Sequence, residues 1–300
     1  MLQAIFDPIL PIFAVLAVGY ILRKVAIFDA THATAINRFV FYLAAPALVF
    51  VIFARAPLGQ LNLPVLASYF AAEVIIYSSI AVLARKFFHL PLAESLLLGM
   101  TAIFANHVFF VRPIAILVYG ESVVLPIGGI IIIDVVAFCL TVFMVDAVTS
   151  GSTPIKAAAM GLLRNPFVIT PVLGVLAWYF SGYVPTGLFT FADFAGAAAA
   201  PVSLFALGVV LAGVPLWPIG WLISIIIAAK LLLHPLLVFV GISAFGDNAG
   251  WQDIAILVAA GPCGAMPFVI AVQYGVAIER IAKAILFSTL LSILTLSFLI

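Results

Sequence analysis

Two stretches of the sequence decide the fold: MTAIFANHVFFVRPIAILVYG at residues 100–120 and ILVAAGPCGAMPFVIAVQYG at residues 256–275. Each is strongly apolar, closes on Tyr-Gly, and carries polar or helix-breaking residues at its centre. Proline lacks an amide hydrogen and clashes with the preceding helical turn, so it interrupts a helix. The freed backbone groups must then face protein or a watery cavity, because lipid cannot satisfy them. Both stretches are therefore predicted to be interrupted membrane helices.

The central residues of the two stretches are the candidate substrate-binding residues. They are Asn106, His107, Arg112, Pro113, Gly261, Pro262, Gly264 and Pro267. Because proline suits the first turn of a helix, Pro113 and Pro267 are each predicted to begin a second half-helix. A helix N-terminus carries partial positive charge and free amide hydrogens, so two of them meeting would form an anion site. A proline kink without a ligand is the alternative for either stretch.

The composition of the whole chain places these stretches in a membrane. Of the 300 residues, 67% are hydrophobic and 8% are charged. A soluble domain of this length lacks the polar surface to cover so much apolar area. A spanning helix needs about 20 mostly apolar residues, and ten such stretches are present. They lie at roughly 5–22, 36–54, 64–84, 95–119, 124–146, 166–181, 194–213, 219–243, 251–275 and 281–299. We therefore predict an all-α integral membrane protein with ten transmembrane helices.

Lysine and arginine in the short loops predict the orientation. Nine of the 12 fall in loops on one side, Arg55 alone falls on the other, and Arg112 and Lys230 lie inside spans. The positive side faces the cytoplasm, so both termini are expected outside the cytoplasmic (inner) membrane. The net charge of +1 argues against nucleic acid as a partner. The lipid bilayer and a small anion are the expected partners.

The two halves of the chain align at a constant offset of 155 residues. The matched positions are Pro11 with Pro166, Gly19 with Gly174, Ala44-Ala45-Pro46 with Ala199-Ala200-Pro201, Phe50 with Phe205, and Tyr119-Gly120 with Tyr274-Gly275. Residues 1–147 and 166–300 are thus predicted to be two repeats of five spans, joined by a cytoplasmic loop at 148–165. An odd number of spans turns the second repeat upside down, which is a common transporter plan. A chance coincidence of prolines and glycines, which are frequent in membrane helices, is the alternative.

The sequence resembles the auxin efflux carrier family, whose bacterial members include malonate and malate permeases. The resemblance rests on residues 11–24, 37–50 and 165–176 and on the two interrupted stretches. It implies two inverted five-helix repeats in which broken helices four and nine cross at the substrate site. It also implies a scaffold unit of spans 1, 2, 6 and 7 and a transport unit of spans 3–5 and 8–10. A homodimer that forms through the scaffold unit is a further option. The family usually has small residues between Asn106 and Pro113, where this chain has His107, two phenylalanines and Arg112.

Three further charged residues fall inside predicted spans: Glu73, Asp134 and Lys230. A charge at the bilayer centre costs several kcal/mol and usually finds a partner in the protein interior. Glu73 plus 155 is 228, so Glu73 and Lys230 are expected at similar depth. They form either a structural charge pair or, with Asp134, a site for a coupling proton. His107 is interpreted either as a further candidate for a proton site, since histidine is the usual side chain for that role, or as a hydrogen-bonding core residue.

Arg112 is the sequence-based candidate for selecting an anion. An arginine in mid-membrane is penalised by roughly 2.5–3.5 kcal/mol and needs a compensating partner. It directly precedes Pro113, where a carboxylate would meet a guanidinium fork and exposed amides. A permanent pair with Glu73 or Asp134, or a position at the membrane surface, is the alternative.

The leading functional hypothesis is secondary transport of a small organic anion (a carboxylate) by alternating access, coupled to H⁺ or Na⁺. A sodium-coupled bile-acid-type symporter is the nearest alternative, and an enzyme embedded in the membrane is a weaker one. The sequence contains no HExxH, GxSxG or GxxxxGK[ST] motif and no cluster with metal-ligand spacing. No enzymatic activity, cofactor or metal site is therefore expected.

Overall fold

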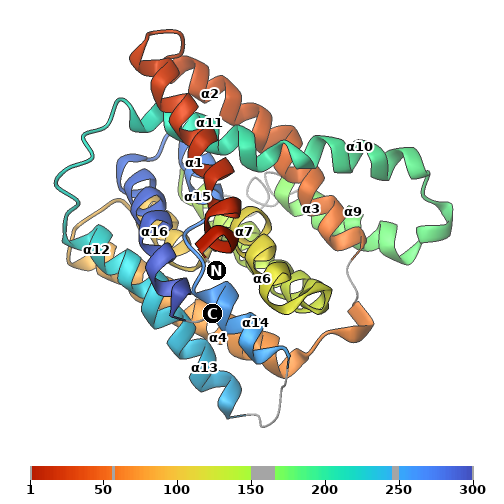
Figure 1. Ribbon diagram of the computed structural model, residues 1–300. Helices are drawn as coiled ribbons and strands as arrows, with labels where there is room; N and C mark the ends of the chain where they lie inside the picture. The colour runs from red at the N-terminus through yellow and green to blue at the C-terminus, as the bar shows by residue number, and fades with distance from the viewer. Residues whose placement is uncertain (1, 56–57, 150–165, 245–249, 299–300) are drawn as a thin grey trace.

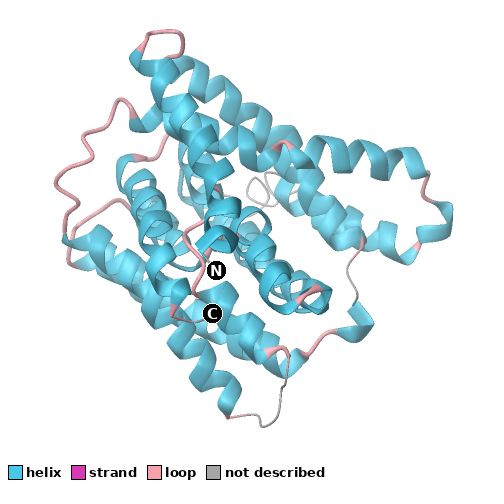
Figure 2. Ribbon diagram, in the orientation of Figure 1, coloured by secondary structure: helices cyan, strands magenta, loops and turns pink. Residues whose placement is uncertain are grey.

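The structure is a computed structural model that describes residues 2–55, 58–149, 166–244 and 250–298. Within these ranges the regular structure is helical, with one isolated antiparallel bridge between Ala105 and Cys263. Most of the expected connecting loop at 148–165 lies outside the described residues. Figure 2 shows that the loops between the described helices are short.

Besides the short 3-10 turns Leu58–Gln60, Glu121–Val123 and Ser181–Tyr183, each half of the described chain forms a series of α- and π-helices. In the first half they are α1 (Leu2–Lys24), α2 (Ala30–Phe39), η1 (Val40–Ala44), α3 (Ala45–Ala54), α4 (Leu63–Lys86), α5 (Leu92–Ile103), η3 (His107–Val111), α6 (Arg112–Tyr119) and α7 (Val124–Thr149). In the second half they are α9 (Pro166–Tyr179), α10 (Thr186–Ala197), α11 (Ala199–Leu211), α12 (Trp221–Ala228), η6 (Ala229–Leu233), α13 (His234–Ser243), α14 (Gln252–Ala259), α15 (Met266–Gln273) and α16 (Glu279–Ser297).

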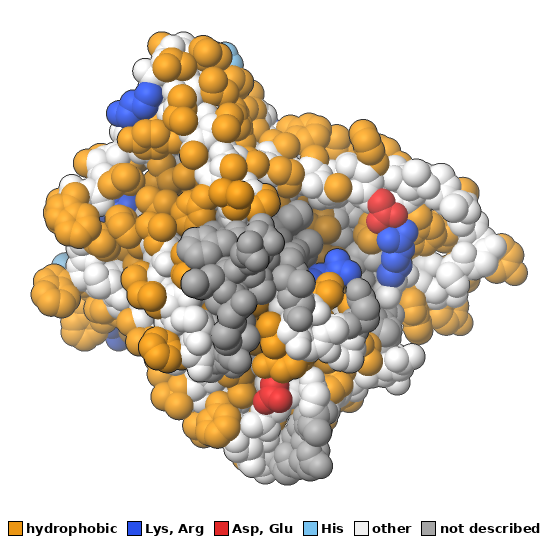
Figure 3. All heavy atoms as spheres, viewed as in Figure 1, with side chains coloured by type: hydrophobic (Ala, Val, Ile, Leu, Met, Phe, Trp, Pro, Cys, Tyr) orange, Lys and Arg blue, Asp and Glu red, His pale blue; other side chains and the backbone are white. Residues whose placement is uncertain are grey.

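Six of the described helical segments are long and apolar enough to cross a membrane. They are Ala30–Ala54, Leu63–Lys86, Val124–Thr149, Thr186–Leu211, Trp221–Ser243 and Glu279–Ser297. The two stretches that open the sequence analysis are each divided into shorter helices, α5 with α6 and α14 with α15. Large hydrophobic side chains are exposed on many helices, and Figure 3 shows them covering much of one face. This surface suits a multi-pass membrane protein, whereas the count of ten spans stays a prediction.

The helices pack as two groups, which Figure 1 shows as an upper and a lower layer. In the first group α1 packs on α11, α9 packs on α3, and α2 and α10 complete the layer. In the second group α4 packs on α5 and α13, α7 packs on α5 and α14, and α16 packs on α12. We call these the first and second helix groups. Contacts between the groups are sparser, and they come mainly from α1, α2, α3 and α11 against α6, α7, α15 and α16.

Each of the three π-helical turns comes just before a helix with proline in its first turn. The amide of Ala45 donates to the carbonyl of Val40, and the amide of Arg112 donates to that of His107. The same five-residue spacing joins His234 to Ala229. Proline clashes with the carbonyl four residues earlier, and a wider turn relieves that clash without breaking the helix. Pro113 lies in the first turn of α6, as expected, and the π-helical turn at His107–Val111 precedes it, so the helical segment begins earlier, at His107.

Glycines allow the closest helix contacts of the first group. A Cβ atom at Gly19 or at Gly208 would collide with the backbone carbonyl of the facing helix, Phe205 O and Leu16 O respectively. A Cβ atom at Gly174 would lie 2.8 Å from Phe50 O. The α1–α11 and α9–α3 pairs therefore approach through backbone surfaces that lack side chains, as small residues permit in membrane helices.

We expect Gly208→Val to separate α1 from α11 and to destabilise the protein by about 1–3 kcal/mol or more, the usual cost of overpacking. Thermal unfolding of the detergent-purified protein measures this as a lower melting temperature. Gly128→Val is the matched control, because a Cβ atom there meets nothing within 4 Å. Equal melting temperatures for the two variants would contradict the close backbone approach.

Candidate functional site

The two helix interruptions lie against each other. The first spans residues 104–106, between α5 and η3, and the second spans residues 260–265, between α14 and α15. The amide of Asn106 donates to the carbonyl of Pro262 at 2.9 Å, and the amide of Gly264 donates to the carbonyl of Phe104 at 2.8 Å. These bonds satisfy backbone groups that an interrupted helix leaves free. The two breaks therefore hold each other in place.

Glycine and proline in the second break explain why it can pair so closely with the first. A Cβ atom at Gly264 would lie 2.7 Å from the Phe104 ring and 2.9 Å from Ala105 O, and one at Gly261 would collide with the Val111 side chain. Pro262 offers a carbonyl without a competing amide hydrogen. Pro267 lies in the first turn of α15, where its missing amide costs nothing.

A pocket lies where the breaks face the first helix group. It encloses about 670 Å³ of empty space, counting the part that opens to solvent. Its described lining comes from α3, α9 and α11 on one side and from α7 and both breaks on the other. The lining residues are Ala45, Leu48, Val49, Ile52, Phe104, Ala105, Asn106, His107, Ile131, Val135, Phe138, Phe167, Ala200, Ser203, Leu204, Gly264, Ala265 and Met266.

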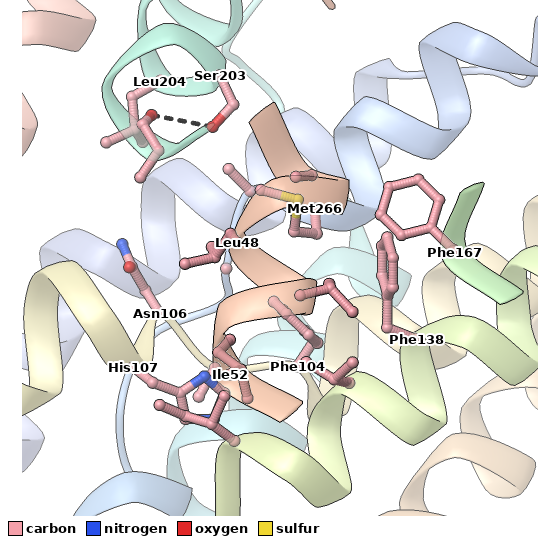
Figure 4. Close-up of a pocket in the computed structure, with 18 residues that line it drawn as sticks. Leu48, Ile52, Phe104, Asn106, His107, Phe138, Phe167, Ser203, Leu204 and Met266 are labelled. Atoms are coloured by element: carbon pink, nitrogen blue, oxygen red, sulfur yellow. Dashed lines mark hydrogen bonds between the residues drawn. The ribbon is translucent and has the colours of Figure 1, made fainter. Parts of the chain in front are cut away.

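Figure 4 shows the labelled side chains converging on this pocket from both helix groups. The rings of Phe138 and Phe167 meet edge to face with centroids 4.5 Å apart and close one side. Asn106 and His107 present polar groups from the first break, and Ser203 presents a hydroxyl from α11. The pocket is thus mainly apolar with a few polar groups that can orient a ligand.

Two helical N-termini also meet the pocket. Ala265 and Met266 line it at the start of α15, and His107 lines it at the start of η3. The first amide groups of a helix have no partner within the helix and carry partial positive charge. Among the described lining residues there is no lysine or arginine, so these helix ends are the positive features that an anion would meet.

His107 connects the pocket to a buried acid. Its Nε2 atom lies 2.7 Å from Oδ2 of Asp134 in α7, and both side chains are buried. The backbone amide of Ala105 also points at Oδ2, at 3.4 Å. Asp134 therefore holds the first break in place through the His107 side chain and the Ala105 backbone amide.

Glu73 in α4 and Lys230 in η6 complete a buried charged cluster with Asp134. All three side chains are at most 1% exposed. The Lys230 ammonium donates to the carbonyl of Ala259 at 2.6 Å and lies 3.3 Å from Nδ1 of His234. The two carboxyl groups are electrostatic neighbours, and the ammonium acts on both. Neither oxygen of Glu73 has a hydrogen-bond partner among the described residues.

The structure separates the sequence-predicted site residues into three sets. Asn106, His107 and Gly264 line the pocket, while Gly261, Pro262 and Pro267 shape the second break. Glu73, Asp134 and Lys230 lie behind the pocket and do not line it.

Arg112 departs from the expected position. It is exposed at the start of α6, is absent from the pocket lining, and forms no pair with Glu73 or Asp134. Its contact with a substrate stays a prediction without support from this geometry, because the wider turn at His107–Val111 lets the helix begin before it. Sequence reasoning also missed Ser203, Phe138, Phe167 and Met266, which carry no local signal in so apolar a chain.

Comparisons with known proteins agree with this architecture. The sequence profile of a family described as "Membrane transport protein" matches residues 4–157 and 152–300. A protein of Rhizobium meliloti (strain 1021) named "Putative malonate transporter" is 31% identical over 298 residues, covering 96% of this chain and 92% of that protein. The fold is similar to that of the sodium proton antiporter MjNhaP1 from Methanocaldococcus jannaschii, with a TM-score of 0.63 at 16% identity, over 96% of this chain and 91% of that one.

Proposed function

Because the chain belongs to the membrane transport protein family, and is thus a membrane transporter rather than an enzyme, we propose that it carries a small organic anion by alternating access. The anion binds in the pocket between the two helix groups and is a carboxylate of the malonate class. The named relative supports this class of substrate, since it is similar along almost the whole chain. A proton or sodium gradient drives the transport.

The observation that carries the proposal is the position of the pocket at the two facing helix breaks. Discontinuous helices place half-helix ends at the substrate site of many transporters, and N-terminal ends favour anionic groups. Here the start of α15 and the start of η3 meet the same pocket, beside Asn106 and His107. A carboxylate would accept hydrogen bonds from the free amides, while the apolar wall holds the short carbon chain.

The same pocket lies between two helix groups that share few contacts. Its wall from α3, α9 and α11 belongs to the first group, and its wall from α7 and the breaks belongs to the second. A rigid shift of one group against the other would open the pocket to alternate sides. The first group corresponds to the scaffold unit of the sequence analysis and the second to the transport unit.

We further propose that the chain is an inverted repeat with ten spans and crossed helices four and nine. A reciprocal contact supports it. Gly19 meets the backbone of Phe205, and Gly174 meets the backbone of Phe50. The two glycines are equivalent positions of the two repeats, and so are the two phenylalanines. Such exchanged contacts are what a two-fold axis between the halves produces.

Purified protein in liposomes tests the transport. We expect uptake of labelled malonate, which is compared with the uptake of a panel of mono- and dicarboxylates. The pH and sodium gradients are imposed separately. Leu48→Trp should abolish uptake because Leu48 lines the pocket, whereas Leu290→Trp should not, because Leu290 is exposed on α16. Normal uptake by the Leu48 variant would place the substrate elsewhere.

We expect both termini to face away from the cytoplasm, in the inner membrane, because nine of ten loop charges lie on the opposite side. A periplasm-active reporter fused to the C-terminus should be active, and a cytoplasm-active one silent. The reverse pattern would overturn the orientation. A fusion near Lys86, after the third predicted span, provides the internal control with the opposite expected result.

A further inference from the structure

A chain of titratable groups leads from the pocket into the second helix group. His107 lines the pocket, Asp134 contacts His107, and Glu73 neighbours Asp134. Glu73 in turn lines a second pocket between α4 and α7, which is partly open to solvent, together with Tyr77 and Thr141. The chain of side chains therefore joins two pockets through a buried region.

The charges of the buried cluster do not balance without a proton. Glu73 and Asp134 supply two carboxyl groups, and Lys230 supplies one ammonium group. Lys230 is fixed by the carbonyl of Ala259, the last residue of α14, where the C-terminal end of a helix favours a cation. An unbalanced charge in mid-membrane is costly, so the cluster requires one added proton to become neutral.

That proton has two places to reside. Two neighbouring carboxyl groups readily share one proton, because both cannot be ionised together at low cost. His107 is the other place, since its Nε2 atom lies within hydrogen-bond distance of Asp134. The total charge of the cluster is the same in both arrangements, and only the second puts a positive charge beside the pocket.

We propose that the Glu73–Asp134–His107 chain binds one exchangeable proton, which moves from the carboxyl pair to His107 when an organic anion enters the pocket. The O–H bond of the carboxyl pair breaks, an N–H bond forms at Nε2 of His107, and no other species is consumed. This rests on the proposed function, and it adds that the imidazolium neutralises the bound anion in the pocket.

The remaining titratable groups around the cluster lie on the side of Lys230. His234 from α13 is next to Lys230, and its ring lies 5.1 Å from that of Tyr69 in α4. The backbone amide of Cys263 in the second break donates to Ser288. Among the described residues these groups add no carboxylate, so the count of one shared proton holds.

Infrared spectroscopy of the purified full-length protein tests the proton site without any transport. Near neutral pH we expect the carbonyl band of a protonated buried carboxyl group. Glu73→Gln should remove it, because Asp134 and Lys230 then balance each other. Asp134→Asn provides a second variant with the same expected loss, should the first fail to fold. Glu279→Gln is the control, since Glu279 forms an ion pair with Lys283 and is half exposed. A band that survives both cluster substitutions would overturn the proposal.

Adding malonate tests the proton movement. The band should weaken in the natural protein and stay constant in His107→Gln, which keeps a polar side chain but cannot be protonated. An unchanged band in protein that calorimetry shows to bind malonate would overturn the transfer. If the natural protein showed the carbonyl band but did not bind malonate, the proposed substrate class would be wrong, whereas the proposed proton site would still hold.

Discussion

Gly264→Val is expected to abolish malonate uptake and to lower the melting temperature of the protein. A side chain at Gly264 would strike the Phe104 ring and the carbonyl of Ala105, at 2.7 and 2.9 Å from its first atom. The Gly264–Phe104 backbone bond would then be lost, and the amides that the breaks present to the pocket would move apart. Overpacking costs about 1–3 kcal/mol, and the lost hydrogen bond adds about 0.5–1.5 kcal/mol.

The measurement pairs uptake in liposomes with thermal unfolding in detergent. Gly128→Val serves as the control here as well, because a Cβ atom there meets nothing within 4 Å. A Gly264 variant that transported malonate at the normal rate would show that the paired breaks do not form the binding site. Loss of uptake at an unchanged melting temperature would place the damage at the site alone.

Lys230→Met is expected to be the most destabilising change in the buried cluster. It leaves two neighbouring carboxyl groups without a cation and the carbonyl of Ala259 without a donor. Removing one partner of a buried charge pair typically costs about 3–5 kcal/mol. Protonation of the second carboxyl group would restore neutrality, so the loss of stability should be greatest at high pH and should shrink as the pH falls.

Melting temperatures measured across a range of pH provide the check. Lys283→Met is the matched control: Lys283 is also buried, but its partner Glu279 is half exposed and remains solvated after the change. If Lys230→Met and Lys283→Met lost the same stability with the same dependence on pH, Lys230 would not be the counter-charge of the carboxyl pair. Uptake by the Lys230 variant should likewise recover only in acid.

The sequence predicted those features of the fold that depend on local composition. Apolar stretches predicted an all-helical membrane protein, and the profile match confirms the family resemblance. The second break was predictable because Gly261, Pro262 and Gly264 disrupt a helix wherever they occur together. Glu73, Asp134 and Lys230 were predictable as buried, since charges within apolar spans are costly.

The first break could not be located from local signals. Residues 104–106 contain no glycine or proline, and they are extended because they pair with residues 262–264 from the other half of the chain. Pro113, the visible helix breaker, lies in the first turn of α6 and not at the first break. Pocket residues such as Ser203 and Phe167 lie on helices whose neighbours have the same character, so only the packing of the two helix groups distinguishes them.

One contact between the helix groups has a kinetic consequence. The side-chain amide of Gln273, at the end of α15, donates to the hydroxyl of Tyr42 in η1 at 2.8 Å, and the pair is exposed to solvent. A neutral hydrogen bond of this kind contributes about 0.5–1.5 kcal/mol, which is a factor of roughly 2–10 in population. In the proposed alternating-access cycle, each turnover breaks this hydrogen bond between the two helix groups and forms it again. A bond of this strength favours the described conformation without making its release the slow step of the cycle.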